Sequence, residues 1–204
     1  MIIQFDNKKQ FLEAIKNNIT RKIGHGSEGN VYLSKDGDVI KIMLNSWLPK
    51  NYGDYPNIIM DDTMKIDSFI FPKELYILNG VIVGHKEKFF PNNILTLDAL
   101  PELINIDKLV EARKKFIEDS KIITEAGYRL YELPRNIMFD NKKIVAIDTL
   151  DYQKKSHVDL EDNIGIIDYA ILVELSELYP NIGVKGNFDE EIGKVYSYNR
   201  KHRR

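Results

Sequence analysis

Cysteine is absent from this 204-residue sequence, and its absence excludes disulfide bonds, thiolate nucleophiles and cysteine-ligated zinc sites. No stretch approaches about 18 uninterrupted apolar residues, the length that a membrane-spanning helix requires. The nearly balanced charge, −2 at pH 7, provides no bulk attraction to nucleic acid or to acidic membranes. We therefore expect neither a nucleic-acid partner nor a membrane association.

What the sequence does contain is typical of a globular protein. Hydrophobic residues make up 43% and charged residues 29%, in a chain long enough for one domain or two closely packed lobes. Residues 1–6 lack the basic region and apolar run of a signal peptide, so we expect a cytoplasmic protein. A secretion route that requires no signal peptide is compatible with the same residues.

The first half of the chain predicts a mostly antiparallel sheet preceded by a short helix. Asn7 is a candidate N-cap for a helix at 8–17, whose apolar residues share one face. The pair Asn79-Gly80 is a strong signal for a two-residue hairpin turn. Prolines and a glycine make 44–64 irregular. Short strands are predicted at 19–23, 30–33, 39–43, 75–78 and 81–83.

The second half predicts helices around one small hairpin. An amphipathic pattern at 107–126 predicts a long helix, which Gly127 ends. The basic end of the chain, residues 199–204, is expected to be solvated and frayed. The further elements predicted here are strands at 136–139 and 143–147 and a last helix at 163–178.

A glycine-rich loop at 24–31 matches the pattern G-x-G-x-x-G-x-V. A dinucleotide-binding loop must open a helix, whereas Asn30 begins a predicted strand, and a Walker A loop needs a Gly-Lys-Ser/Thr ending that is missing. A glycine loop between two strands is typical of the flap that covers ATP, because missing Cβ atoms let backbone N–H groups approach phosphates. The alternative interpretation is a glycine-rich bulge in a hairpin.

Lys41 lies inside the apolar strand predicted at 39–43, shortly after the glycine loop. A lysine in such a strand is costly to bury unless an anion meets it. We therefore predict that Lys41 pairs with phosphate groups. The alternative is a lysine on an edge strand that points to water.

Asn136 and Asp148 flank the predicted hairpin in the second half. Asn136 comes just before its first strand and Asp148 just after its second, so both side chains can converge at one end of it. An amide oxygen from a loop and a carboxylate at a strand end are suitable ligands for Mg²⁺ on nucleotide phosphates. The alternative is a turn asparagine and a strand-terminal aspartate of a common kind.

In this order and spacing, the glycine loop, Lys41, Asn136 and Asp148 resemble the protein-kinase superfamily, over roughly residues 19–178. The resemblance implies an α+β, two-lobed protein-kinase-like fold. Its N-lobe at 1–90 would carry an antiparallel sheet, and its C-lobe at 91–204 would be helical and short. The implied activity is binding of ATP with Mg²⁺ or Mn²⁺ and transfer of the γ-phosphate to a hydroxyl of a protein or small molecule.

The resemblance also implies roles for individual residues. Lys41, Glu132 and Asp148 would be catalytic, and Asn136 and Asp148 would bind the metal ion. The segment 86–90 would be the hinge that contacts adenine. The implied nucleotide contacts are Ile23, Gly24, His25, Gly26, Ser27, Gly29, Val31, Lys41, Glu87 and Phe89.

The sequence departs from the family pattern at the catalytic loop. The family's catalytic aspartate lies five residues before the asparagine, and here that position is Tyr131. The nearest carboxylate is Glu132, which we interpret as a substitute base; the alternative is a surface partner for Arg129 or Arg135. Two other functions therefore stay open: an inactive pseudokinase that acts as a nucleotide-responsive binding module, and a small-molecule phosphotransferase.

Two further family features are missing from the sequence. No glutamate lies between Lys41 and Glu74 to pair with the lysine, although Asp61 or Asp62 could substitute. Asp148 is followed by Thr149-Leu150 instead of Phe-Gly, and few residues follow the helix at 163–178. We therefore expect the family's usual platform for a peptide substrate to be missing.

Overall fold

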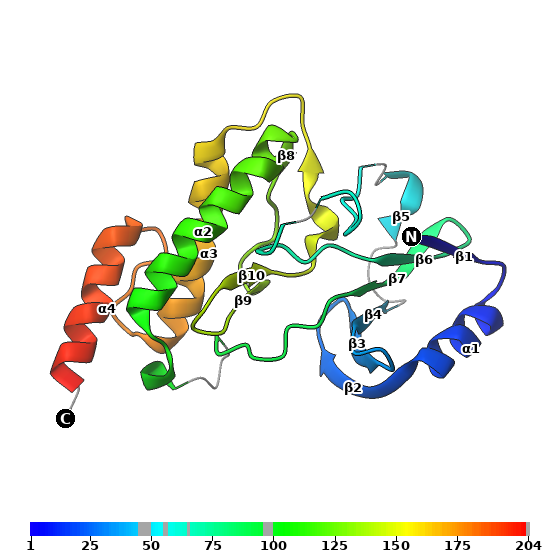
Figure 1. The fold of residues 1–204 in the computed structure, drawn as a ribbon, viewed down its shortest axis with the longest axis horizontal. Helices are drawn as coiled ribbons and strands as arrows, with labels where there is room; N and C mark the ends of the chain where they lie inside the picture. The colour runs from blue at the N-terminus through cyan, green and yellow to red at the C-terminus, as the bar shows by residue number, and fades with distance from the viewer. Residues whose placement is uncertain (45–49, 55–56, 65, 96–99, 203–204) are drawn as a thin grey trace. The chain divides into compact units, whose positions relative to one another are not determined.

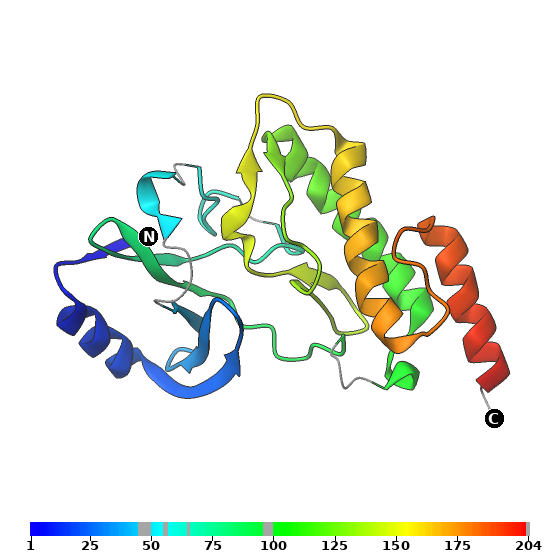
Figure 2. The ribbon, with the colours of Figure 1, turned by 180° about the vertical axis from the view of Figure 1, so that it is seen from behind.

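The computed structural model describes residues 1–44, 50–54, 57–64, 66–95 and 100–202, and it is a mixed α+β fold (Figures 1 and 2). The chain divides into two compact units. The first comprises residues 1–65 and 70–89, and the second comprises 66–69 and 90–204. Among the described residues, no helix is both long and apolar enough to cross a membrane.

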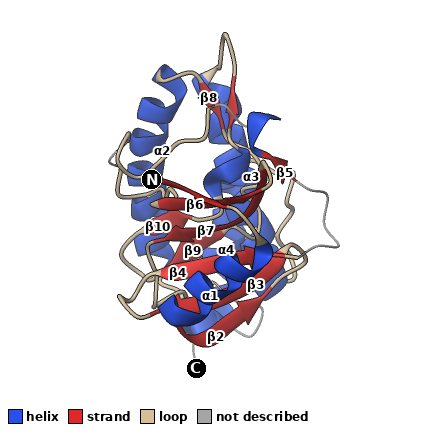
Figure 3. Cartoon of the chain, turned by 90° about the vertical axis from the view of Figure 1, so that its right-hand side faces the viewer, coloured by secondary structure: helices blue, strands red, loops and turns tan. Residues whose placement is uncertain are grey.

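The first unit is built on one seven-stranded sheet, in the order β1-β6-β7-β4-β3-β2, with β5 paired to β7 (Figure 3). All strand pairs are antiparallel except β1 with β6, as the sequence pattern predicted for most of the sheet. The short strand β1 was not predicted. The strands are β1 (Ile2–Phe5), β2 (Ile19–His25), β3 (Gly29–Ser34), β4 (Val39–Met43), β5 (Lys50–Asn51), β6 (Glu74–Leu78) and β7 (Val81–Glu87).

Helix α1 (Lys8–Asn18) covers one face of this sheet (Figure 1). The predicted cap is confirmed, because the Asn7 side chain accepts a hydrogen bond from the Gln10 N–H at 3.0 Å. Phe11 and Ile15, about one turn apart, are buried against Tyr76 and its neighbours in the sheet. The helix therefore contributes an apolar stripe that shields one side of the sheet from water.

The β6–β7 hairpin turns at Asn79 and Gly80, both with positive φ, so the predicted turn is confirmed. The predicted end of the second strand at Val83 is wrong. Strand β7 continues to Glu87, which pairs across the sheet with Val39. Gly84 and the three consecutive polar residues that follow it, at 85–87, hid this extension from the sequence pattern. The first part of the segment predicted as a hinge is therefore sheet.

In the second unit, α2 packs against two small strand pairs, and α3 and α4 pack against α2 and each other (Figure 2). The pairs are β9 with β10 and β8 with β11, and the first of these is the predicted hairpin. Its apolar core lies between the helices and the β9–β10 pair and includes Leu109, Phe116, Ile123, Phe139, Val145, Ile167, Ile171, Leu175 and Val195. The helices are α2 (Ile106–Glu125), α3 (Leu160–Leu178) and α4 (Phe188–His202), and the strands are β8 (Tyr128–Arg129), β9 (Ile137–Phe139), β10 (Ile144–Ala146) and β11 (Gln153–Lys154).

Helix α4 shows that the prediction of 163–178 as the last helix is wrong. Residues 199–202 of the basic end belong to this helix, with Arg200 and Lys201 exposed as expected, and residues 203–204 lie outside the described residues. Phe188, Ile192 and Val195 lie at helical spacing and are buried. The Arg113 guanidinium lies 4.2 Å from the centroid of the Phe188 ring and makes two bonds to Asp168, at 2.6 and 2.7 Å. This one arginine therefore links α2, α3 and α4.

A cluster of charged side chains lies where β4, β6 and β7 run side by side. The Lys86 ammonium forms an ion pair with Asp36 and lies 3.7 Å from a Glu74 carboxylate oxygen. The Ser34 hydroxyl also donates a hydrogen bond to Asp36, at 2.5 Å. The bond from Lys86, together with that from Ser34, lowers the pKa of Asp36 from its ordinary 3.8 to about 2.

We predict that Asp36 contributes to stability in a pH-dependent way. Its folded pKa is depressed, so its contribution is complete above about pH 4 and is lost as the pH falls through about 2. Because 57% of the side chain is exposed, solvent screens the pair and the contribution is small. In urea unfolding, Asp36→Asn should cost stability at about pH 6 and progressively less below about pH 4. A cost that is the same at both ends of this range, or a similar cost for the exposed Asp62→Asn, would contradict the prediction.

Candidate functional site

The glycine loop closes the β2–β3 hairpin of the first unit. The Gly26 N–H donates to the Gly29 carbonyl at 2.9 Å, which places Ser27 and Glu28 at the tip. A Cβ atom on Gly29 would lie 2.5 Å from the Ile42 carbonyl oxygen, so only glycine fits there. A Cβ atom on Gly26 would meet nothing within 4 Å. Packing therefore requires glycine at position 29, whereas it does not require glycine at position 26.

Lys41 lies on β4, a central strand between β3 and β7. The alternative of a lysine on an edge strand is therefore wrong. Lys41 stands opposite Val31 on one side and His85 on the other, so these three residues share a face of the sheet. Its neighbours along the strand, Ile40 and Ile42, pack on the other face, toward α1. The lysine side chain is 14% exposed.

The carboxylate partner of Lys41 comes from the glycine loop. Oε2 of Glu28 lies 2.8 Å from the Lys41 ammonium, and its Oε1 lies 3.9 Å from that of Lys50 on β5. Sequence reasoning looked for this partner after Lys41, at Asp61 or Asp62, and missed it. The pairing depends on the folded hairpin, which returns Glu28 beside β4, and no spacing rule along the chain reveals it.

His85 and Glu87 form a buried polar pair on β7, beside Lys41. His85 Nε2 and Glu87 Oε2 are 3.4 Å apart, beyond the usual hydrogen-bond distance. The other ring nitrogen, His85 Nδ1, is buried and has no hydrogen-bond partner among the residues that the structure describes. Such groups are uncommon in protein interiors, and this one lies on the same face of the sheet as Lys41. Sequence reasoning named Glu87 as a hinge residue and missed His85.

In the second unit, the β9–β10 hairpin brings Asn136 beside Asp148. The Ile147 N–H donates to the Asn136 carbonyl at 2.9 Å, one residue before Asp148. The Asn136 side-chain amide donates to the Glu132 carbonyl at 2.7 Å, so its Oδ1 is the atom left for other contacts. Asp148 has a left-handed conformation, φ 56° and ψ 47°, and its Oδ1 is buried.

The loop before β9 exposes Tyr131, which stands where the kinase resemblance would place an aspartate, and the next residue, Glu132. Leu130 and Leu133 are fully buried, whereas Tyr131 is 44% exposed and Glu132 is also exposed. The backbone of Glu132 has a left-handed conformation, with φ 49°. Its side chain therefore does not follow the alternating side-chain directions of an extended chain. One of its carboxylate oxygens lies within 4.8 Å of one from Asp151.

Backbone strain is concentrated around this loop. Five non-glycine residues have positive φ among the described residues, and two of them, Asn79 and Asn141, are ordinary turn asparagines. The other three are Glu132, Arg135 and Asp148. Left-handed residues other than glycine and asparagine persist where the surrounding structure holds them, and they are often found at functional sites. This clustering is independent support for a site here.

Helix α3 holds the loop at both ends. Asn163 is fully buried; its Oδ1 accepts from the Leu130 N–H at 3.0 Å, and its amide donates to Thr124 and to the Tyr128 carbonyl. About three helical turns further on, Glu174 accepts from the Arg135 N–H at 2.7 Å. Burial raises the pKa of Glu174, and the Arg135 N–H bond opposes that rise. Sequence reasoning identified neither residue.

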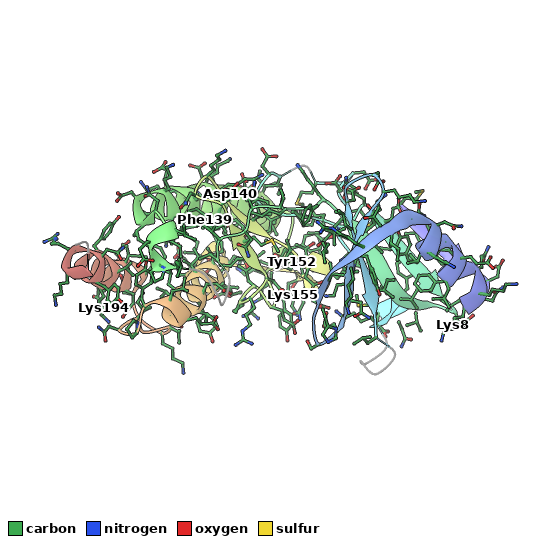
Figure 4. All side chains as sticks on the ribbon, turned by 90° about the horizontal axis from the view of Figure 1, so that it is seen from below. Lys8, Phe139, Asp140, Tyr152, Lys155 and Lys194 are labelled. Carbon is green, nitrogen blue, oxygen red and sulfur yellow. The ribbon has the colours of Figure 1, made fainter. Side chains whose placement is uncertain are left out.

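Tyr152, labelled in Figure 4, is a buried phenol next to the Asp148 segment. Burial, and then the charge of Asp148, raise the pKa of its hydroxyl, which has no hydrogen-bond partner within the described part of the chain. Its ring packs edge-on against Phe69, whose ring stacks on Phe116 at 4.7 Å. Tyr152 therefore adds an aromatic wall beside Asp148, and sequence reasoning missed it.

No family model matches this chain, and no curated protein sequence matches it. The arrangement within each unit is the remaining guide to function. The first unit groups the glycine loop with Lys41, and the second groups Glu132, Asn136 and Asp148. Arg135, one alternative partner of Glu132, has its guanidinium 3.5 Å from Glu177 instead.

We predict that Asn163 is the main anchor of the loop. Asn163→Ala removes three hydrogen bonds and leaves buried backbone groups unsatisfied, so the free energy of unfolding should fall by about 2–4 kcal/mol in urea titrations. The exposed Asn18→Ala, which removes one bond to the Ala14 carbonyl, is the matched control and should cost less than about 1 kcal/mol. Equal costs for the two variants would refute the anchoring role.

Proposed function

We propose that this protein is an atypical, two-lobed, kinase-like phosphotransferase that binds ATP with Mg²⁺ or Mn²⁺ and transfers the γ-phosphate to a hydroxyl group. The observation that carries the proposal is Lys41, a largely buried cation in a central strand that meets the tip of the glycine loop through Glu28. A cation in that position is expected where a polyphosphate binds.

The first unit supplies the proposed nucleotide contacts. Lys41 would pair with the α- and β-phosphates, and the backbone N–H groups around Gly26 would approach the phosphates, which gives that glycine a reason that packing does not. Val31 shares the face of Lys41 and would contact the base together with Ile23. The hinge role stays with Glu87 and Phe89, where β7 ends and the chain leaves the sheet.

The second unit supplies the proposed metal ligands and base. The Asn136 Oδ1 and the Asp148 carboxylate are oxygen ligands of the kind that Mg²⁺ prefers, and the ion would neutralise charge on the phosphates. Glu132 would accept the proton of the acceptor hydroxyl. The hydroxyl oxygen would form its bond to the γ-phosphorus as the bond from that phosphorus to ADP breaks and ADP leaves. The left-handed turn at Glu132 supports this role, because it turns the carboxylate out of the direction that an extended chain would give it.

The main competing function is a pseudokinase, a nucleotide-responsive binding module without turnover. It is favoured by Tyr131, which occupies the position of the family's catalytic aspartate and is 44% exposed. A general base contributes only about 10²–10⁴-fold, so its loss slows transfer without removing nucleotide binding. The two functions therefore share the binding site and differ in turnover. A small-molecule acceptor is compatible with the phosphotransferase function.

We predict that Mg·ATP at about 100 times its Kd stabilises the protein by about 2.7 kcal/mol, measured as a raised Tm. Asp148→Asn should bring the affinity in Mg²⁺ down toward the metal-free value, because it removes a charged ligand. Asp151→Asn, in the same short 3-10 helix that begins after Asp148, is the control and should keep the metal effect. If ATP, ADP and GTP all leave the Tm unchanged, the proposal is refuted. If Asp151→Asn loses the metal effect and Asp148→Asn keeps it, the metal ligand is Asp151, three residues further along the chain.

We predict that γ-labelled ATP with Mg²⁺ or Mn²⁺ gives slow transfer of label to the protein or to an added hydroxyl acceptor. Glu132→Gln should reduce this transfer about 10²–10⁴-fold and leave ATP affinity nearly unchanged. If the wild type transfers nothing, Tyr131→Asp tests whether only the base is missing. If Tyr131→Asp transfers label, the site is otherwise competent. If it binds ATP and still transfers no label, the pseudokinase function is favoured.

A further inference from the structure

We propose that Lys50 is a second polyphosphate-binding lysine, and that the Glu28 carboxylate occupies the position of a phosphoryl group between Lys50 and Lys41 until a polyphosphate exchanges with it. This inference rests on the proposed nucleotide binding and adds to it a residue outside the family's motifs and a built-in competitor.

The geometry of Glu28 is the first support. Its two carboxylate oxygens face two different ammonium groups, with Oε2 at 2.8 Å from Lys41 and Oε1 at 3.9 Å from Lys50. A carboxylate and a phosphoryl group both present oxygens bound to a single atom, so lysines arranged around one are arranged for the other. A triphosphate carries more negative charge than one carboxylate and can contact both lysines at once.

The position of Lys50 is fixed by the sheet and not by chance contacts of a surface side chain. Lys50 pairs with Ile82, and its neighbour Asn51 pairs with Val81, so β5 lies along β7. The Tyr52 N–H donates to the Gly80 carbonyl at 2.8 Å and continues this attachment. The lysine side chain is only 10% exposed, although lysines normally extend their ammonium groups into water. Holding it there is costly in solvation, which an anion offsets.

Glu28 is placed so that its side chain can leave without unfolding the loop. Its backbone is held independently, because its carbonyl accepts from the Leu44 N–H at 2.8 Å. Exchange therefore requires only rotation of one side chain at the hairpin tip. Only molecules in which the Glu28 carboxylate has left the two lysines are competent to bind a polyphosphate. The apparent affinity is therefore the intrinsic affinity multiplied by the fraction of such molecules.

Two roles for Glu28 can be distinguished by the sign of one measurement. If Glu28 competes with phosphate, Glu28→Gln keeps the shape, removes the charge and tightens polyphosphate binding. If Glu28 instead orients Lys41 toward the nucleotide, the same change loosens binding. The position of the carboxylate, with one oxygen 2.8 Å from Lys41 and the other 3.9 Å from Lys50, favours competition, because a phosphoryl group would need the same two ammonium groups.

The experiment is calorimetric titration of the full chain with Mg·ATP and, separately, with inorganic tripolyphosphate. Lys50→Met and Lys41→Met should each weaken both ligands about tenfold or more, since each removes a charged contact to phosphate. Glu28→Gln should tighten both ligands several-fold. The controls are Lys73→Met, which removes an ion pair to Asp38, and Glu74→Gln, beside Lys86; both should leave affinity within about twofold.

Each outcome has a distinct meaning. If the wild type binds neither ligand, the proposed nucleotide binding fails as a whole. If the wild type binds, and Lys41→Met weakens that binding but Lys50→Met does not, the proposed role of Lys50 is refuted. If Glu28→Gln loosens binding, the exchange is refuted and Glu28 orients Lys41. Circular dichroism reports folding of each variant, and Lys50→Gln, which keeps a donor for Glu28, replaces Lys50→Met should that variant not fold.

Discussion

The charge of Lys41, on a central strand of the sheet, is the constraint to which the residues around it in the first unit respond. A lysine in a central strand faces a large desolvation cost, and an anion at 2.8 Å offsets it. That anion comes from the hairpin tip, whose backbone is held beside β4 by the bond from the Leu44 N–H to the Glu28 carbonyl. The close approach of Gly29 to the Ile42 carbonyl is part of the same arrangement, because any side chain there would push the loop away. Helix α1 covers the opposite face of the sheet, where Ile40 and Ile42 pack.

The second unit solves a different problem, which is to hold an irregular loop in one conformation. Three left-handed residues raise the energy of this region, and the loop persists because Asn163 and Glu174 bind its backbone from one rigid helix. The helix is itself fixed by the bonds between Arg113 and Asp168 and by its apolar core. The geometry around Asn136 and Asp148 is therefore determined by tertiary packing more than by the hairpin sequence that identifies it.

Local signals in the sequence predicted most of the elements. The Asn7 cap, the Asn79-Gly80 turn and the long helix before Gly127 each depend on residues a few positions apart, and all three are present. Strand β1 and helix α4 were missed because partners far along the chain stabilise them: β6 pairs with β1, and the Arg113 side chain covers Phe188. The contacts of Lys41 with Glu28, and the anchoring by Asn163, are non-local in the same way. Candidate site residues with a motif could be named in advance, whereas the residues that position them could not.

Polyphosphate binding and proton transfer place different demands on the residues of the proposed site. These demands decide which of the two would better tolerate the loss of a residue. Binding a polyphosphate needs charge and backbone donors within a few ångströms, and several groups share the work, so the loss of one weakens binding in steps. Proton transfer needs one carboxylate within hydrogen-bond reach of one hydroxyl. In the proposed function, Tyr131 stands where the kinase superfamily has its aspartate, which leaves the first demand untouched and would shift the second onto Glu132. In the proposed function, turnover would therefore depend on the left-handed conformation of Glu132, held by the α3 anchors around it, and nucleotide binding would depend on Lys41 and its neighbours.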